Sequence, residues 1–237
     1  MTEKILIIIP AYNESESIKK TIQEILALPF KVDIAVIDDG SSDATSRYAK
    51  ETTANVLTLP FNLGIGGAVQ TGFQFAFKKN YDIAVQIDAD GQHDGAFLQD
   101  LVTPVKSGEV DIAIGSRFIG PFLGYRSSFV RRIGINFFAH LISFLVQDRV
   151  TDPTSGFRAF NRKAIKAFAL DYPYDYPEPE AIVLAQRLNL RFKEIPVQMR
   201  KRQAGHSSIR YLRTLYYMVK VTLAILLDML KPQKRLI

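Results

Sequence analysis

The chain has 237 residues, 47% of them apolar, which is enough for one sizeable hydrophobic core, and it has no cysteine, which excludes disulfides and thiolate metal sites. Its net charge of +6 is unevenly distributed: residues 1–186 carry 18 Lys and Arg against 22 Asp and Glu, whereas residues 187–237 carry 12 against 2. The apolar run near the N-terminus ends at Pro10 and lacks the length and cleavage site of a signal peptide, so we expect a cytoplasmic protein.

Short strands and longer helices alternate through the first half of the chain. Strands are predicted where Ile and Val cluster in brief runs, and helices where apolar residues recur every three or four positions. The predicted strands are residues 4–12, 31–39, 55–60, 81–90 and 110–118, and the helices between them are residues 14–28, 44–52, 64–79 and 94–108. This order predicts an α/β, Rossmann-like fold with a mainly parallel sheet and helices on both faces.

The second half of the chain is more helical and more basic. Residues 127–146 form a predicted helix with a very apolar body, 152–168 a loop that leads into a helix, and 187–208 a strand followed by a basic loop. The last predicted helix, 209–230, is amphipathic. Its longest apolar run, 221–227, is far shorter than the roughly 20 residues that span a bilayer, so we expect no transmembrane helix.

Polar side chains follow three of the predicted strands at the point where each strand ends. Asn13 follows the first strand, Asp39 the second and Asp88 the fourth. Ligands of such sheets bind beyond the carboxyl ends of the strands. We therefore expect the three clusters to converge on one crevice.

Asp88 and Asp90 flank Ala89 at the end of the fourth predicted strand and lie on one side of the chain if the extended geometry persists. Two carboxylates suit Mg²⁺ or Mn²⁺, which prefer oxygen ligands and keep positions open for phosphates. A dication would also offset the repulsion between the two acids. The alternative is an exposed acidic turn that caps the following helix.

Two more segments border the same crevice. Asp38 and Asp39 end the second strand, where acids accept hydrogen bonds from ribose hydroxyls or base N–H groups, although a capped turn is the alternative. The glycines of residues 64–67 open a helix but lack the Lys-Ser/Thr pair of a phosphate-binding loop. We expect these glycines to serve close packing beside the crevice.

Two glutamates and two histidines complete the candidates. Glu178 and Glu180 each follow a proline, and they are either directed toward a sugar's hydroxyls or part of a plain turn before a helix. His93 and His206 invite a catalytic interpretation, but no paired serine or cysteine motif accompanies them, which argues against a nucleophilic triad.

Seven motifs occur in the order typical of family-2 glycosyltransferases with the GT-A fold. They are IIIPAYNE, VIDDGSSDAT, NLGIGGAVQTGF, QIDADGQHD, IGSRF, TDPTSGFRAF and KRQAGHSSI. Together they cover about residues 4–210, and the chain most resembles the branch of dolichyl- and polyprenyl-phosphate sugar synthases. The resemblance implies a catalytic domain over residues 1–210, and we assign residues 211–237 to a separate basic amphipathic segment.

The resemblance assigns a set of residues to the nucleotide-sugar donor and to a metal. Those implied to contact the nucleoside are Pro10, Ala11, Tyr12, Glu14 and Asp39. The stretch implied to meet the donor's diphosphate holds Asp88, Ala89 and Asp90, and the implied ligands of Mg²⁺ or Mn²⁺ are Asp88, Asp90 and Gln92.

The resemblance assigns four more residues to catalysis. Arg117 and Arg131 match basic residues that engage the acceptor's phosphate, and Arg202 matches an arginine on a loop that closes over the donor. Asp152 matches an acid assigned to the acceptor side or to base function. Two neighbouring arginines, Arg126 and Arg132, are expected to be ordinary surface charges.

The implied reaction is inverting, metal-dependent transfer of a sugar from a UDP- or GDP-linked donor to a polyprenyl phosphate. Such an acceptor arrives ionised, because the second pKa of a phosphate monoester is about 6, so arginines that place it matter more than a base. The alternatives are transfer to a sugar hydroxyl of a surface polysaccharide or glycolipid, and a non-catalytic scaffold that binds nucleotide sugar or membrane.

The basic C-terminal segment indicates which partners the protein could bind. Tyr, Leu, Ile and Val beside Arg and Lys suit a helix in a membrane interface, and a helix buried between subunits of an oligomer is the alternative. A solvated helix face is a third interpretation of the charge. We expect peripheral association with the cytoplasmic membrane face, with or without a separate integral-membrane partner, and no nucleic acid, because the basic residues accompany apolar helix positions rather than stacking aromatics.

Overall fold

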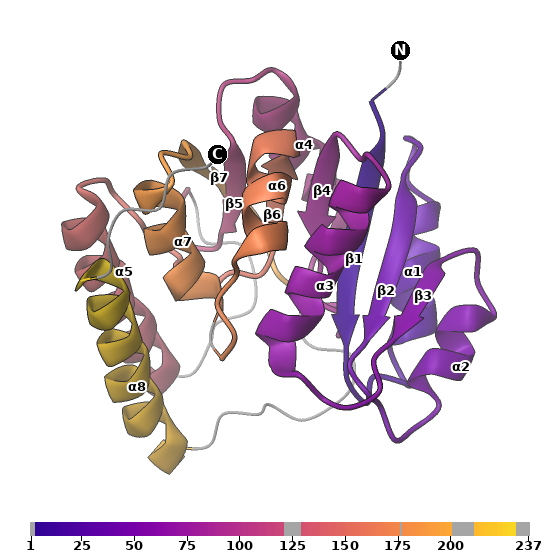
Figure 1. Ribbon diagram of the computed structural model, residues 1–237, viewed down its shortest axis with the longest axis horizontal. Helices are drawn as coiled ribbons and strands as arrows, with labels where there is room; N and C mark the ends of the chain where they lie inside the picture. Colours follow the sequence, from indigo (N-terminus) through magenta and orange to yellow (C-terminus); the bar gives the residue numbers. More distant parts are fainter. Residues whose placement is uncertain (1–2, 121–128, 176, 201–210, 231–237) are drawn as a thin grey trace.

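The computed structural model describes residues 3–120, 129–175, 177–200 and 211–230, apart from the side chains of residues 129–131 and 211–217 (Figure 1). Its centre is a seven-stranded sheet in the order β3-β2-β1-β4-β6-β5-β7. The strands are β1 (Ile5–Ala11), β2 (Asp33–Asp38), β3 (Asn55–Thr58), β4 (Ile83–Gln86), β5 (Ile112–Ser116), β6 (Arg158–Asn161) and β7 (Phe192–Pro196). Only β6 among them is antiparallel to its neighbours, so the predicted mainly parallel sheet is confirmed.

Strand β6 corrects one prediction, because residues 158–161 were expected to lie in a loop. Four residues are too few to show a strand's alternation, and one of them is the charged Arg158. The strand forms because β4 and β5 each offer it an edge: Phe160 pairs with Ala84 on one side and Ile112 on the other. A neighbour far away in the sequence therefore decides the conformation of this segment.

Helices cover both faces of the sheet, as predicted (Figure 1). They are α1 (Ile18–Leu26), α2 (Thr45–Lys50), α3 (Gly64–Lys78), α4 (Leu98–Lys106), α5 (Phe129–Val146), α6 (Arg162–Leu170), α7 (Pro177–Arg187) and α8 (Tyr211–Leu230). Successive residues of β1 point to opposite faces, so Ile7 and Ile9 pack with α1 and α4 while Leu6 and Ile8 pack with α3 and α6. The sheet thus has a hydrophobic core on each side.

Three helices, α5, α7 and α8, form a layer at one edge of the molecule (Figure 1). Helix α7 contacts both α5 and α8, and the buried Val221 and Ile225 of α8 belong to the core on that side of the sheet. None of the helices in the described part of the chain is apolar over enough of its length to cross a bilayer.

Candidate functional site

A cavity of about 460 Å³ opens at the carboxyl ends of β1, β2 and β4. We call it the strand-end cavity. The eight residues expected to contact the donor all line it: Pro10, Ala11, Tyr12, Glu14, Asp39, Asp88, Ala89 and Asp90. The structure therefore brings together segments about 80 positions apart, because parallel strands end at the same edge of the sheet.

The loops after β1 and β2 are held to each other by polar side chains. The amide oxygen of Asn13 accepts from the Ser42 N–H at 2.9 Å, and the Asn13 N–H donates to the Ser41 hydroxyl at 3.0 Å. Thr45 accepts from the Glu14 N–H at 2.8 Å. Asn13 itself is absent from the cavity wall, so it shapes the loop that presents Tyr12 and Glu14.

Asp39 connects the second strand to the glycine-rich helix. Its two carboxylate oxygens accept from the backbone N–H groups of Leu63 at 2.7 Å and Gly64 at 3.0 Å. Burial raises the pKa of Asp39, these two hydrogen bonds oppose the rise, and the charge of Asp38 adds to it. The side chain predicted to contact a nucleoside thus also positions the start of α3.

The glycines of α3 serve close packing, as predicted. A Cβ at Gly66 would lie 2.1 Å from the carbonyl oxygen of Pro173 and 2.2 Å from that of Tyr174. The Gly66 N–H donates to the same Tyr174 carbonyl at 3.0 Å. Only glycine permits this approach, which sets the turn before α7 against the helix that borders the cavity.

The Asp88–Asp90 segment is shaped by its own loop. His93 Nδ1 accepts from the Asp88 N–H at 3.0 Å, and His93 Nε2 lies 3.7 Å from Asp88 Oδ2. Asp90 accepts from the Gln92 N–H at 3.0 Å. His93 is buried and stacks on Phe157 at 4.9 Å, so it positions Asp88 and belongs to no triad within the described residues.

The alternative interpretation of this acidic segment was a helix cap. That role belongs to Asp94, whose side chain accepts from the Ala96 N–H at the start of a short 3₁₀ helix. Asp88 and Asp90 instead line the strand-end cavity, where the Asp88 side chain is 40% exposed.

The carboxylates of the strand-end cavity fit a divalent metal. Two carboxylates converge on one cavity, and a Cβ at Gly156 would lie 2.9 Å from Asp88 Oδ1, so glycine there leaves room for that carboxylate. The described residues contain no cluster of three or more acidic, His or Cys ligands. Two carboxylates fit Mg²⁺ or Mn²⁺ when phosphates and water supply the other ligands. The Gln92 side chain lies outside the cavity wall and donates to the Arg200 carbonyl at 3.4 Å.

Arg117 and Asp152 form a buried ion pair beyond β5. Arg117 Nε and Nη2 donate to the two carboxylate oxygens, each at 2.6 Å, and Asp152 is fully buried. Glu194 of β7 accepts from the Asp152 N–H at 2.7 Å and from Thr151. Burial lowers the pKa of Arg117, but hydrogen bonds and charge from Asp152, together with the charge of Asp88, raise it overall. The guanidinium is therefore a fixed positive charge beside the cavity.

Two further residues of the site were missed or only partly recognised from the sequence. Arg158 is buried and donates to the carbonyls of Ser155 at 2.7 Å and Glu178 at 2.8 Å, which ties the loop before β6 to the start of α7. Glu178 lines the strand-end cavity, and burial raises its pKa to about 7 against the opposing charge of Arg158. The signal for Arg158 was a charge inside the apolar run GFRAF.

Residues 6–168 match the family described as Glycosyl transferase family 2. The chain belongs to glycosyl transferase family 2. It is a glycosyltransferase, and the non-catalytic scaffold considered above is set aside. The resemblance seen in the motifs is confirmed over more than half of the chain.

Relatives of this glycosyltransferase include enzymes named for lipid-phosphate acceptors. An undecaprenyl-phosphate mannosyltransferase of Micrococcus luteus is 30% identical over 218 residues, which cover 87% of each chain. A UDP-N-acetylglucosamine–dolichyl-phosphate N-acetylglucosaminyltransferase of Methanococcus voltae is 30% identical over 219 residues, 84% of this chain and 86% of that one.

The fold of this glycosyltransferase also matches solved structures. Glucosyl-3-phosphoglycerate synthase from Mycobacterium tuberculosis, in complex with Mn²⁺, UDP and glucosyl-3-phosphoglycerate, superposes with a TM-score of 0.73. The match covers 95% of this chain and 79% of that chain at 24% identity. It confirms the GT-A type of fold.

Four residues named in the sequence of this glycosyltransferase lack a described side chain. Arg126, Arg202 and His206 lie outside the described residues. Arg131 lies in the first turn of α5, but its side chain is outside them too. Their expected roles therefore stay predictions.

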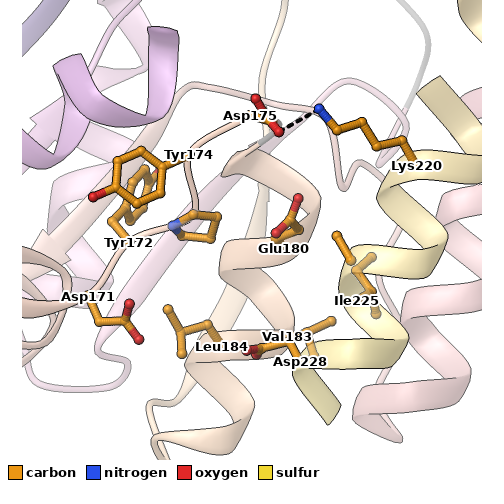
Figure 2. A pocket seen from close by; sticks show the side chains of 12 residues that line it. Asp171, Tyr172, Tyr174, Asp175, Glu180, Val183, Leu184, Lys220, Ile225 and Asp228 are labelled. Carbon is orange, nitrogen blue, oxygen red and sulfur yellow. Dashed lines mark ion pairs between the residues drawn. The ribbon is translucent and has the colours of Figure 1, made fainter. Parts of the chain in front are cut away.

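A second cavity of about 320 Å³ lies between α7, α8 and the turn before α7 (Figure 2). We call it the helix cavity. Glu180, Asp228 and Lys220 lie along its walls, and Lys220 pairs with Asp175 at 2.6 Å. Asp175 lines the strand-end cavity as well, so this ion pair joins α8 to the wall of that cavity.

Proposed function

We propose that this glycosyltransferase moves a sugar from a UDP- or GDP-linked donor to a polyprenyl phosphate, with inversion at the anomeric carbon and with Mg²⁺ or Mn²⁺ as cofactor. The observation that carries the proposal is the strand-end cavity, where the eight residues expected to contact the donor lie together, with the carboxylates of Asp88 and Asp90 among them. The names of the relatives from M. luteus and M. voltae support the acceptor class.

The donor's nucleoside occupies the part of the cavity next to β1. Tyr12 is half-exposed there and offers a ring face to a base, while Glu14 and Asp39 offer carboxylates to ribose or base donors. The diphosphate lies toward Asp88 and Asp90, which would hold the metal. The bound metal supplies positive charge where negative charge builds on the departing diphosphate.

The acceptor phosphate approaches from the side of Arg117. Nε and Nη2 of that arginine are engaged by Asp152 and Thr154, whereas Nη1 has no hydrogen bond within the described part of the chain. In this proposal Nη1 donates to an acceptor oxygen. Asp152 is a positioning residue, since both its oxygens already accept from the guanidinium, and Arg131 and Arg202 complete the positive charge.

The transfer to a phosphate needs no general base. An oxygen of the phosphate dianion attacks the anomeric carbon and forms a new C–O bond on the face opposite the leaving group. The bond to the β-phosphate oxygen breaks, and the nucleoside diphosphate leaves with the electron pair. No proton has to move, since the acceptor is already ionised near neutral pH.

Glu178 favours a second candidate, transfer to a sugar hydroxyl. A hydroxyl acceptor must lose a proton, and a carboxylate with a pKa of about 7 is matched to that task. Under the first proposal the same side chain accepts a hydrogen bond from a hydroxyl of the donor sugar. The chemical stability of the product separates the two.

The experiment incubates purified protein with labelled UDP- and GDP-sugars, Mn²⁺ or Mg²⁺, and a polyprenyl phosphate. Label that enters the lipid phase and is released by mild acid identifies a glycosyl phosphate. Acid-resistant label on a glycan acceptor instead supports the hydroxyl candidate. Transfer that is unchanged in EDTA contradicts the metal assignment.

Arg131 provides a finer test of the acceptor side. We expect Arg131→Ala to raise the apparent KM for polyprenyl phosphate more than the KM for the donor, because the variant removes positive charge from the acceptor side only. Arg132→Ala, an exposed neighbour on α5, is the matched control. Equal acceptor KM values for Arg131→Ala and the parent enzyme would show that Arg131 does not bind the acceptor.

A further inference from the structure

Two adjacent helices of this glycosyltransferase present large apolar side chains to solvent. On α5 these are Ile133, Phe137 and Phe144, and on α8 they are Leu223, Leu227 and Leu230; the most exposed are Phe144 at 81% and Leu230 at 82%. They define what we call the outer apolar face. Exposed apolar side chains gathered in this way mark an interaction surface.

The spacing of these residues makes a continuous stripe on each helix. Leu223, Leu227 and Leu230 recur at intervals of four and three, and Ile133, Phe137 and Phe144 at intervals of four and seven, which places each set on one side of its helix. The opposite sides carry the buried Val221 and Ile225 of α8, which pack into the core. Packing on α7 therefore accounts for one face of α8, and no described residue covers the other.

The two stripes belong to one surface. Helices α5 and α8 contact each other, and a Cβ at Gly134 would lie 3.9 Å from the Met218 sulfur, so their axes pass close together. Both helices lie at the edge of the molecule farthest from β3 (Figure 1).

Charge distinguishes the possible occupants. Five Lys and Arg lie between residues 200 and 213, three more lie between 231 and 237, and neither segment contains an acid. Two acids near α8, Asp228 and Asp175, pair with Arg187 and Lys220. An anionic surface suits an apolar helix face that basic segments flank in the sequence. A second copy does not, because α8 has basic segments at both ends, so either orientation of a paired α8 brings like charges together.

We propose that the outer apolar face of α5 and α8 docks on an anionic lipid surface. The proposal rests on the proposed function in one respect: docking would give the enzyme access to an acceptor held in a membrane. The ion pair between Lys220 and Asp175 connects the docked helix to the wall of the strand-end cavity, at 2.6 Å (Figure 2). Docking thus sets the reaction site beside the lipid headgroups.

The experiment is co-sedimentation of the full chain with vesicles that contain neither polyprenyl phosphate nor donor. We expect binding to phosphatidylcholine vesicles that contain phosphatidylglycerol, at least about tenfold weaker binding to phosphatidylcholine alone, and weakening by added salt. The double variant Leu223→Gln/Leu227→Gln should bind at least about tenfold more weakly than the parent, because it removes two apolar anchors.

The matched control is Leu26→Gln/Leu170→Gln, which changes two exposed leucines on α1 and α6. This control should bind vesicles like the parent. Equal losses in both double variants, or no binding of the parent to anionic vesicles, would overturn the proposal. So would a stable dimer in light scattering that Leu223→Gln/Leu227→Gln dissolves, since a second copy would then cover the face.

Transfer assays with a short, water-soluble polyprenyl phosphate keep the two proposals apart. We expect Leu223→Gln/Leu227→Gln to keep its rate on that soluble acceptor while it loses vesicle binding. If the parent enzyme binds vesicles but transfers no sugar, the proposed function is contradicted and the docking surface is still supported.

Discussion

The loops at the ends of β1, β2 and β4 are joined by polar side chains that bond to the backbone of their neighbours, such as Asn13 to Ser42 and Asp39 to Leu63. Helices α5, α7 and α8 pack differently, through apolar side chains: α7 contacts both of the others, and α5 and α8 each bury one apolar face and expose another. The first region is built for fixed geometry around a small polar ligand. The second exposes apolar side chains on two of its helices. Under the two proposals, one chain combines a site of fixed geometry for a soluble donor with a surface that docks on lipid.

The largest expected effect comes from the carboxylates of the rigid region. Under the proposed function, Asp90→Ala should reduce transfer at least about a hundredfold, because the variant would lose a ligand of the proposed metal, which would stabilise the departing diphosphate. Initial rates at saturating donor and Mn²⁺, together with a thermal melt, measure activity and folding separately. Asp100→Ala, an exposed acid on α4, is the control. An Asp90→Ala enzyme with full activity would contradict the metal assignment.

The next largest effect concerns the contribution of the buried Arg117–Asp152 ion pair to stability. Asp152→Asn leaves the guanidinium of Arg117 buried without its counter-charge, and we expect the free energy of unfolding to fall by about 3 kcal/mol. Urea unfolding measures it. Glu109→Gln breaks an exposed pair with Lys193 and should cost less than about 1 kcal/mol. Similar losses in the two variants would show that Asp152 has no special structural role.

A pair of glycine variants compares the packing of the two regions directly. Gly66→Ala places a methyl group against the carbonyls of Pro173 and Tyr174 and should destabilise the fold by about 2–3 kcal/mol. Gly134→Ala in α5 meets nothing closer than the Met218 sulfur at 3.9 Å and should stabilise by about 0.5–1 kcal/mol, because alanine favours the helix. Chemical denaturation measures both changes. Effects of the same sign would remove the contrast in packing.

The smallest expected effect is a pH dependence from Glu178. Its pKa in the folded protein, about 7, exceeds the ordinary value of 4.5 because of burial. The folded protein then holds more protons than the unfolded chain between these values. The free energy of unfolding should therefore fall, by up to about 1.4 kcal/mol per pH unit, as the pH rises through that window.

The variant Glu178→Gln should flatten that part of the stability profile, measured by urea unfolding in EDTA. Glu109→Gln, an exposed acid, should leave the slope unchanged. A profile that keeps its slope in Glu178→Gln would place the raised pKa on another group. Transfer rates of the same variant across that pH range show whether the carboxyl also acts on substrate.

Much of the strand-end cavity could be predicted from the sequence, because the residues that line it lie next to recognisable strand patterns. Strands β1, β2 and β4 are short apolar runs rich in Ile and Val, and each is followed within a few residues by polar side chains that line the cavity. The parallel order of the strands then places Tyr12, Asp39 and Asp88 at one edge. Strand β6 and the partners of Asp39 could not be predicted in this way, because they depend on chain segments more than 20 residues away.

The sequence by itself determined the alternating fold, the family motifs, the paired acids after β4 and the basic amphipathic end of the chain. Tertiary structure alone decided that Asp152 pairs with Arg117 and that Arg158 ties β6 to α7. It further decided that Glu178 lines the same cavity as Asp88. It also decided which sides of α5 and α8 remain exposed. The physical reason is that strand and helix patterns follow from neighbouring residues, whereas burial, ion pairing and pKa shifts arise only when distant segments pack together.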